Sequence, residues 1–275
     1  MKTIARLLVL ACAFVTTSAP ADDRHPALQS KFHFDIGGFF TARDFRASAG
    51  GTTVDIPIPL IDFETAVGLK DTPELLIAGF GWRFSENWDV GLQYFSSSRS
   101  AQVVLQDTIE WEGLTFDAGI DISAGTDLAI TRLVFSRRIW ENGPHSVKLA
   151  GGFHQLDAGA DISGMATLDD QSREFRRSVV SASLPIPNVG AWYRYSPTRR
   201  WLFGARVDWF SANVGDYSGL ILNAALNAGF AFNEHFAVGL AYQYFKVDGE
   251  IRTTGWKGNL QSRFDGPILR ITGYW

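Results

Sequence analysis

Apolar residues occupy every second position in one stretch after another of this chain, from residue 31 to the C-terminus. In the final stretch, DGPILRITGYW, Leu269, Ile271 and Trp275 share one face, and the opposite face contains an arginine. The stretch WLFGARVDWF, residues 201–210, repeats the pattern. Because alternate side chains of a strand point to opposite sides, the pattern predicts an all-β protein whose strands each have one apolar face.

Alternation alone also fits a soluble β-sandwich, so other features must decide between the two. The polar faces are rich in glycine, alanine and asparagine, which suit a crowded barrel interior better than a solvated sheet surface. Aromatic residues flank the apolar faces, as the interfacial girdles of membrane barrels do. Short turns alternate with longer connections: the turns lie near 85–87, 141–144, 197–200 and 233–234, and the longer connections near 45–73, 100–126, 158–186 and 250–263.

Short turns at one end and long loops at the other are typical of a transmembrane β-barrel. The fold prediction is therefore a closed antiparallel barrel with short periplasmic turns and long extracellular loops. Four short turns with both termini on the same side imply ten strands; eight or twelve stay open, because TTVDIPIPLIDF and LTFDAGIDIS in two loops also alternate. The predicted strands lie near 31–43, 75–84, 88–99, 128–140, 146–157, 188–196, 201–211, 219–232, 236–247 and 264–275.

The N-terminus has the pattern of a secretory signal. Lys2 and Arg6 precede the apolar run 7–15, and a small-residue cleavage motif ends at Ala21. The single cysteine, Cys12, lies in this segment, so the mature chain would have no thiolate and no disulfide. The predicted parts are a cleaved signal peptide (1–21), a short periplasmic tail (22–30) and the barrel (31–275), located in the outer membrane of a Gram-negative bacterium.

The ending ILRITGYW resembles the C-terminal assembly signal of bacterial outer-membrane proteins, with Trp275 where phenylalanine is usual and Gly273 where an aromatic is common. The resemblance implies that Leu269, Ile271 and Trp275 serve barrel closure and recognition by the barrel assembly machinery. The whole chain resembles a family of uncharacterised proteobacterial outer-membrane β-barrel proteins, which implies the fold and the location but no activity. The matching landmarks are IDFETAVGL, LPIPNVGAWYRYSPTRRW, NVGDYSG and YQYFKVDGEI.

A ten-stranded barrel has a narrow lumen, and wide aqueous channels belong to barrels of about 16–18 strands. We favour a lumen filled by side chains, in which arginines brace the interior through hydrogen bonds. A narrow or gated, porin-like pore that prefers anions is the alternative. The strand parity points these charged residues inward: Asp35, Arg43, Arg83, Arg132, Arg194, Arg206, Asp208 and Arg270.

Enzymatic activity is less favoured. Only His154, near the outer end of its strand, is placed like a catalytic base, and Asp157 follows it closely. An outer-membrane hydrolase with a His/Asp site at the rim is therefore a second alternative, although no G-x-S-x-G or H-E-x-x-H motif occurs. No cofactor is expected, and no metal site, because the loop carboxylates match no calcium loop.

The expected function is a structural, adhesive or binding role through the extracellular loops. The expected partners are outer-membrane lipid and lipopolysaccharide. A nucleic-acid partner is not expected, because the formal net charge is −4.

Overall fold

The computed structural model describes residues 24–50, 61–62, 66, 74–111, 114–168, 171–214, 217–253 and 256–275, so the predicted signal peptide lies outside the described residues. A short 3-10 helix, η1 (Pro26–Leu28), precedes the strands. The strands are β1 (Phe32–Phe40), β2 (Ala42–Gly50), β3 (Ile61–Asp62), β4 (Glu74–Arg83), β5 (Trp88–Val104), β6 (Ile109–Trp111), β7 (Leu114–Phe116), β8 (Asp121–Asn142), β9 (His145–Leu168), β10 (Gln171–Tyr195), β11 (Trp201–Val214), β12 (Tyr217–Ala231), β13 (Phe236–Thr253) and β14 (Trp256–Tyr274).

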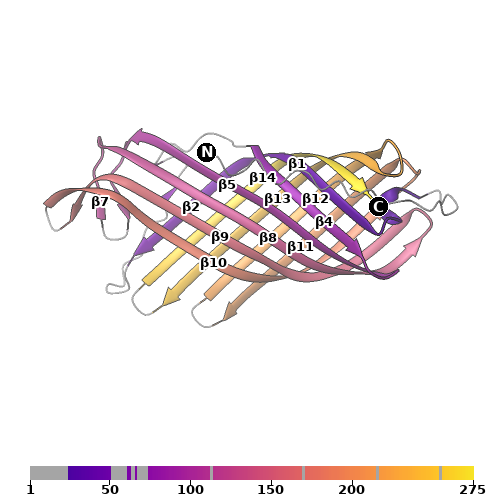
Figure 1. Cartoon of the computed structure of the whole chain (residues 1–275). Helices are drawn as coiled ribbons and strands as arrows, with labels where there is room; N and C mark the ends of the chain where they lie inside the picture. The colour runs from indigo at the N-terminus through magenta and orange to yellow at the C-terminus, as the bar shows by residue number, and fades with distance from the viewer. Residues whose placement is uncertain are drawn as a thin grey trace.

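The strands close into an antiparallel barrel (Figure 1). β1 and β2 are two parts of one barrel strand, because both pair with β14 on either side of Thr41. A Cβ on Gly266 would lie 2.1 Å from the carbonyl oxygen of Phe40, so only glycine allows the close approach at this break. With the short β3, β6 and β7 set aside, ten barrel strands remain, and the predicted fold and strand number are confirmed.

The predicted short turns are confirmed, and they all lie at one end of the barrel. They connect β4 to β5, β8 to β9, β10 to β11 and β12 to β13. The C-terminus lies at the same end (Figure 1). There the amide of Phe32 donates to the carbonyl of Trp275 at 2.6 Å, and the amide of Trp275 donates back at 2.9 Å. The first and last strands therefore close the barrel, which leaves no open edge within lipid.

Two of the predicted long loops are wrong. Residues 158–168 and 171–186 belong to β9 and β10, and most of 250–263 belongs to β13 and β14. These segments alternate weakly in sequence, but each hairpin continues its ladder outward, and backbone pairing overrides the low β-propensity of small residues. As a result β8, β9 and β10 run the whole length of the barrel (Figure 1). In the connection predicted at 100–126, LTFDAGIDIS contributes both β7 and the start of β8.

The outward faces form an apolar belt with aromatic side chains near its borders. Leu226, Leu240 and Ile271, for example, are 67%, 58% and 57% exposed. Such a belt would be costly in water but is what the hydrocarbon of a bilayer requires. The other exposed members include Phe34, Ile36, Leu76, Trp82, Leu92, Phe135, Leu149, Phe153, Val207, Trp209 and Leu269.

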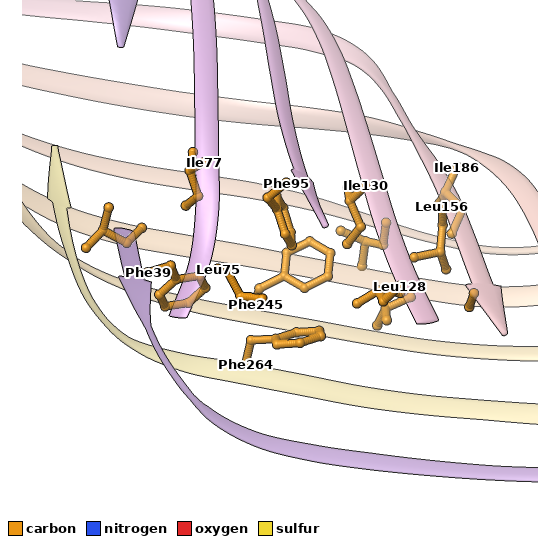
Figure 2. Close-up of a cluster of buried hydrophobic side chains, with 14 of the residues drawn as sticks. Phe39, Leu75, Ile77, Phe95, Leu128, Ile130, Leu156, Ile186, Phe245 and Phe264 are labelled. Atoms are coloured by element: carbon orange, nitrogen blue, oxygen red, sulfur yellow. The ribbon is translucent and has the colours of Figure 1, made fainter. Parts of the chain in front are cut away.

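An apolar layer crosses the lumen (Figure 2). Phe39, Phe95, Phe245 and Phe264 lie in it, each at most 5% exposed. Phe95 meets both Phe245 and Phe264 edge to face. Nine of the ten barrel strands contribute buried members to this layer, and β11 contributes the partly buried Phe210. The other buried members are Leu75, Ile77, Leu128, Ile130, Leu156, Ala158, Ile186, Ile221, Ala241, Val247 and Ile268.

A second buried cluster lies farther from the periplasmic turns. Phe116 of β7 and Ile61 of β3 pack there against the inner faces of β8 and β9. The β6–β7 hairpin and β3 therefore fold onto the barrel wall, and the extracellular end has a core of its own. Its remaining members are Leu105, Ile109, Leu114, Ile122, Ala124, Ala160 and Ile162.

The wall of the barrel splits between β10 and β11. Pairing stops at Val189 and Trp209, although both strands continue beyond that pair. The amide of Ser196 donates to a carbonyl of the β8–β9 turn, so the uninterrupted register turns the odd-numbered amides of β10 toward β11. The next two odd positions are Pro187 and Pro185, which have no N–H. The two prolines therefore account for the end of this ladder.

Candidate functional site in the barrel lumen

Between the apolar layer and the periplasmic turns, the lumen is polar. Glycines on the inner faces provide the space: a Cβ on Gly190 would lie 2.3 Å from Oδ1 of Asp208, and one on Gly79 would lie 2.5 Å from Oδ1 of Asp35. Each glycine is directly opposite the polar residue on the neighbouring strand. The glycine-rich polar faces thus let charged side chains lie flat against the wall.

Asp208 is the centre of one charged group. It is fully buried, and its Oδ1 accepts hydrogen bonds from Nη2 of Arg132 (2.9 Å) and Nε1 of Trp192 (3.1 Å). Its Oδ2 accepts from Nδ2 of Asn223 (3.1 Å) and lies 3.2 Å from Nε of Arg206. The Arg132 guanidinium also lies over the Trp192 ring, 5.4 Å from its centre. One buried carboxylate therefore balances two guanidinium groups.

Asp89 is the centre of a second group, closer to the periplasmic turns. Its Oδ2 accepts from Nζ of Lys148 at 2.5 Å, and its Oδ1 lies 3.4 Å from Nε of Arg83. Ser136 donates to the same carboxylate at 3.4 Å. Lys148 is 4% exposed, so this pair too is largely shielded from water.

The segment before β1 packs into the periplasmic mouth. We call residues 24–30 the plug. Nη1 of Arg83 donates to the carbonyl of Leu28 (2.7 Å), and Nη1 of Arg194 donates to the carbonyl of Ala27 (3.3 Å). Leu28 is 4% exposed, and His25 is fully buried against the edge of Tyr274. The predicted periplasmic tail is therefore packed against the lumen.

His25 is held in its neutral form. Burial, and then the nearby Arg194 guanidinium, lower its pKa from 6.5 to about 4. Its Nδ1 accepts a hydrogen bond from the amide of Ala27 (3.1 Å), and its own amide donates to Oγ of Ser196 (3.2 Å). The neutral ring thus caps η1, and the backbone amide of His25 fastens the plug to the β10–β11 turn.

The plug and the two charged groups surround a cavity of about 220 Å³, which we call the lumenal chamber. Arg206 and Arg270 line it on one side, and Lys148 and Arg194 on another. The Nε atoms of Arg132 and Arg270 are buried without a hydrogen-bond partner among the described residues, whereas Nε of Arg206 has its ion-pair contact with Asp208. In and around the chamber, six basic side chains face three acidic ones: Arg83, Arg132, Lys148, Arg194, Arg206 and Arg270 against Asp35, Asp89 and Asp208.

The structure brings together most of the residues whose charge the sequence points inward. Asp35, Arg132, Arg194, Arg206 and Arg270 line the lumenal chamber; Asp208 and Arg83 contact its lining. The side chain of Arg43 lies outside the described part of the chain.

Sequence reasoning missed two features of this site. The position of Asp89 points it into the lumen, because it alternates with the outward Trp88, Val90 and Leu92. It is only the second residue of β5, however, and next to the short turn it resembles a turn residue in the sequence. The plug carries no alternating signal, and its burial depends on arginines more than fifty residues away in sequence.

The His/Asp site suggested by the sequence is not formed. His154 points into the lumen and is 1% exposed, whereas Asp157 is an odd number of residues away and faces outward. Both ring nitrogens of His154 lack a hydrogen-bond partner among the described residues, and the ring packs 6.0 Å from Phe245. Asp157 accepts a hydrogen bond from Ser183 instead. His154 also lies in the middle of a long strand, not at the rim.

The C-terminal residues lie in the closing strand, as the register with β1 requires. The Trp275 ring lies near Phe34 and Phe236, edge to face with both at 6.1 Å. A Cβ on Gly273 would lie 2.4 Å from the Trp275 indole, so the indole covers this glycine. The two departures from the usual assembly signal are therefore linked: the larger ring at 275 requires the bare backbone at 273.

Two kinds of site are absent from the described residues. No three or more His, Cys, Asp or Glu side chains converge there as metal ligands would. Nor does any helix of that part of the chain have the length and apolarity to cross a membrane.

Comparison with protein-family models gives no match, and no curated protein matches the sequence. Among solved structures, the chain is similar to the outer membrane protease OmpT from Escherichia coli, with a TM-score of 0.57, 9% identity, and coverage of 89% of this chain and 96% of that one. Lower scores relate it to the toluene transporter TodX of Pseudomonas putida (TM-score 0.37, 9% identity, 89% and 90% covered) and to the attachment invasion locus protein Ail of Yersinia pestis (0.29, 12%, 87% and 97%). At 9% identity the likeness to OmpT shows the fold alone, and that fold is the outer-membrane β-barrel.

Proposed function

We propose that the protein is an integral outer-membrane barrel that conducts no solute and acts by binding through its extracellular end. The observation that carries the proposal is the apolar layer, to which nine barrel strands contribute buried side chains and β11 contributes the partly buried Phe210. Aromatic and aliphatic side chains packed across a narrow lumen exclude water, and ions do not cross a dry constriction. The proposal includes a cleaved signal peptide over residues 1–21.

The ordered extracellular end supports a binding role. Passive loops need no core, yet the β6–β7 hairpin and β3 bury Phe116 and Ile61 against the wall. β8, β9 and β10, with 22, 24 and 25 residues, are far longer than the 10 residues of β4. A strand of about 9–11 residues already spans a bilayer, so these strands hold a surface well outside the membrane.

Lipopolysaccharide is the partner that the outer face of β13 and β14 fits best. Lys246 and Arg263 are directly opposite each other on neighbouring strands and are 41% and 53% exposed. The Arg263 guanidinium lies over the Tyr244 ring, 5.2 Å from its centre, and the apolar Leu240 lies on the same face. Each of the two basic residues also pairs with an aspartate of its own strand, Lys246 with Asp248 (2.7 Å) and Arg263 with Asp265 (3.0 Å). This face therefore changes from apolar through aromatic to charged, and its exposed cations suit the border at which acyl chains meet phosphates.

The non-conducting state is tested with purified protein in a planar bilayer. We expect no conductance steps from the wild type. A variant with Phe95→Ser, Phe245→Ser and Phe264→Ser opens a wet path and should conduct, whereas Phe153→Ser on the lipid side is the matched control. A conducting wild type contradicts the proposal.

The lipid partner is tested by thermal unfolding with and without lipopolysaccharide. We expect the unfolding midpoint of the wild type to rise with lipopolysaccharide and less with its dephosphorylated form. The double variant Lys246→Gln, Arg263→Gln should lose most of that rise, and Arg137→Gln, near the periplasmic turns, should keep it. Equal shifts in all three proteins contradict this part of the proposal.

A further inference from the structure

The charges of the lumenal chamber do not cancel. Asp208 compensates for Arg132 and Arg206 together, and Asp89 for Lys148 and Arg83. Arg194 and Arg270 add two more positive charges, against Asp35 alone. A low-dielectric wall strengthens the field of such an excess, so the chamber favours an anion strongly over a neutral solute.

The plug already occupies part of this site with oxygen atoms. The carbonyls of Ala27 and Leu28 accept from Arg83 and Arg194 in the manner of an anion, although they carry only partial charge. Behind them, Arg206 and Arg270 line the same cavity, and the Nε of Arg270 has no hydrogen-bond partner among the described residues. Basic side chains therefore outnumber carboxylates around a space that the apolar layer separates from the extracellular end.

We propose that the lumenal chamber binds a small multiply charged anion of the phosphate type, which enters from the periplasm when the plug moves aside. A tetrahedral oxyanion offers several acceptors at once, and guanidinium groups bind such groups in pairs. A cavity needs only about 10–15 Å³ to hold one water, so 220 Å³ accommodates an anion of several atoms. Its position behind the plug favours a free anion over the headgroup of a lipid.

Arg270 is the best residue with which to test the site. It lines the chamber, its Nε has no hydrogen-bond partner, and no ion pair within 4 Å is formed by Arg270 among the described residues. We expect Arg270→Gln to fold and to bind inorganic phosphate about tenfold more weakly or worse, because a charge-assisted contact is lost. Arg263→Gln, on the outer face of the same strand, should leave the affinity unchanged.

The experiment is a calorimetric titration of the refolded mature chain with inorganic phosphate, at an ionic strength kept constant with chloride. Saturable binding that weakens in Arg270→Gln alone supports the proposal. The proposal is overturned if phosphate shows no saturable binding, if chloride binds with the same affinity as phosphate, or if Arg270→Gln and Arg263→Gln bind phosphate equally well. Phosphate binding is measured independently of conductance, so its failure can be distinguished from a failure of the proposed non-conducting lumen.

Movement of the plug has its own readout. A single thiol at Ala27→Cys in a signal-free chain without other cysteines reports access from the aqueous side. We expect saturating phosphate to speed its reaction with an impermeant maleimide several-fold. The anion would replace the plug carbonyls as the hydrogen-bond acceptor of Arg83 and Arg194, and the plug would be released. A rate that does not change with phosphate overturns the proposed entry route.

Discussion

Replacing Asp208 by Asn removes the single negative charge that Arg132 and Arg206 share. The substitution keeps the size of the side chain, so no cavity complicates the result. What it leaves is two buried guanidinium groups without a counter-charge, since Asp208 is fully buried and Arg132 is 5% exposed. Breaking a buried ion pair in this way costs about 3–5 kcal/mol.

We expect the lower half of that range, about 3–4 kcal/mol, for two structural reasons. The Trp192 ring still lies over Arg132 after the substitution. The carboxylate of Asp35 still attracts the Arg206 guanidinium electrostatically. The amide group of Asn can keep one of the hydrogen bonds that Oδ1 and Oδ2 accept. A loss of 3 kcal/mol lowers the ratio of folded to unfolded protein by about a hundredfold.

The assay is equilibrium unfolding by urea in lipid vesicles, followed by the gel shift between folded and heated protein. Asp265→Asn is the matched control, because Asp265 also pairs with an arginine, Arg263, but at the exposed outer face. Exposed pairs contribute only about 0–1 kcal/mol. Adding Arg206→Gln to Asp208→Asn should recover part of the loss. If Asp208→Asn costs no more than Asp265→Asn, the lumen is hydrated and the reasoning from a dry interior is wrong.

Three further predictions concern the wall, the terminus and the plug. Gly190→Ala should lower stability by more than 1 kcal/mol in the same urea assay, because its Cβ meets Asp208, whereas Gly249→Ala, with nothing within 4 Å, should be neutral. Trp275→Asp should reduce the folded protein recovered from outer membranes, because it puts a charge at the lipid interface; wild-type recovery would refute this. Docking of the plug should weaken as pH falls from 6.5 to 4, because the pKa of His25 is lower in the docked plug than in the released one, which takes up the proton. Proteolysis of the plug should therefore increase over that pH range, and His25→Gln should remove the pH dependence.

The sequence predicts the membrane-embedded half of this protein well because period two is enforced there on both faces. Lipid demands apolar side chains outside, and the narrow lumen demands glycine or paired polar groups inside, so Leu269 and Arg270 can be assigned to opposite faces by counting. Outside the membrane one constraint is lifted. The run AGADISGMATL at 158–168 then carries small and polar residues on both faces, and its strand forms only because β8 and β10 pair with it.

The lumenal chamber was predictable as a set of charges but not as a cavity. Parity identifies Arg132, Arg206 and Asp208 as inward, yet nothing local shows that these three share one network. Their contacts join β8 to β11 across the barrel, and only closure determines which strands face each other. The same holds for the plug, whose capping residue His25 reads in sequence as part of a tail.

The prolines at 185 and 187 have a consequence for how such a barrel can change over time. Because they end the ladder between β10 and β11, the described residues of the two hairpins have no backbone pairing beyond Val189 and Trp209. One hairpin can therefore gain or lose residues in multiples of two without shifting the register of the other. The membrane half stays fixed by closure, while the surface presented to the outside is free to diversify in length, and with it in what the cell displays.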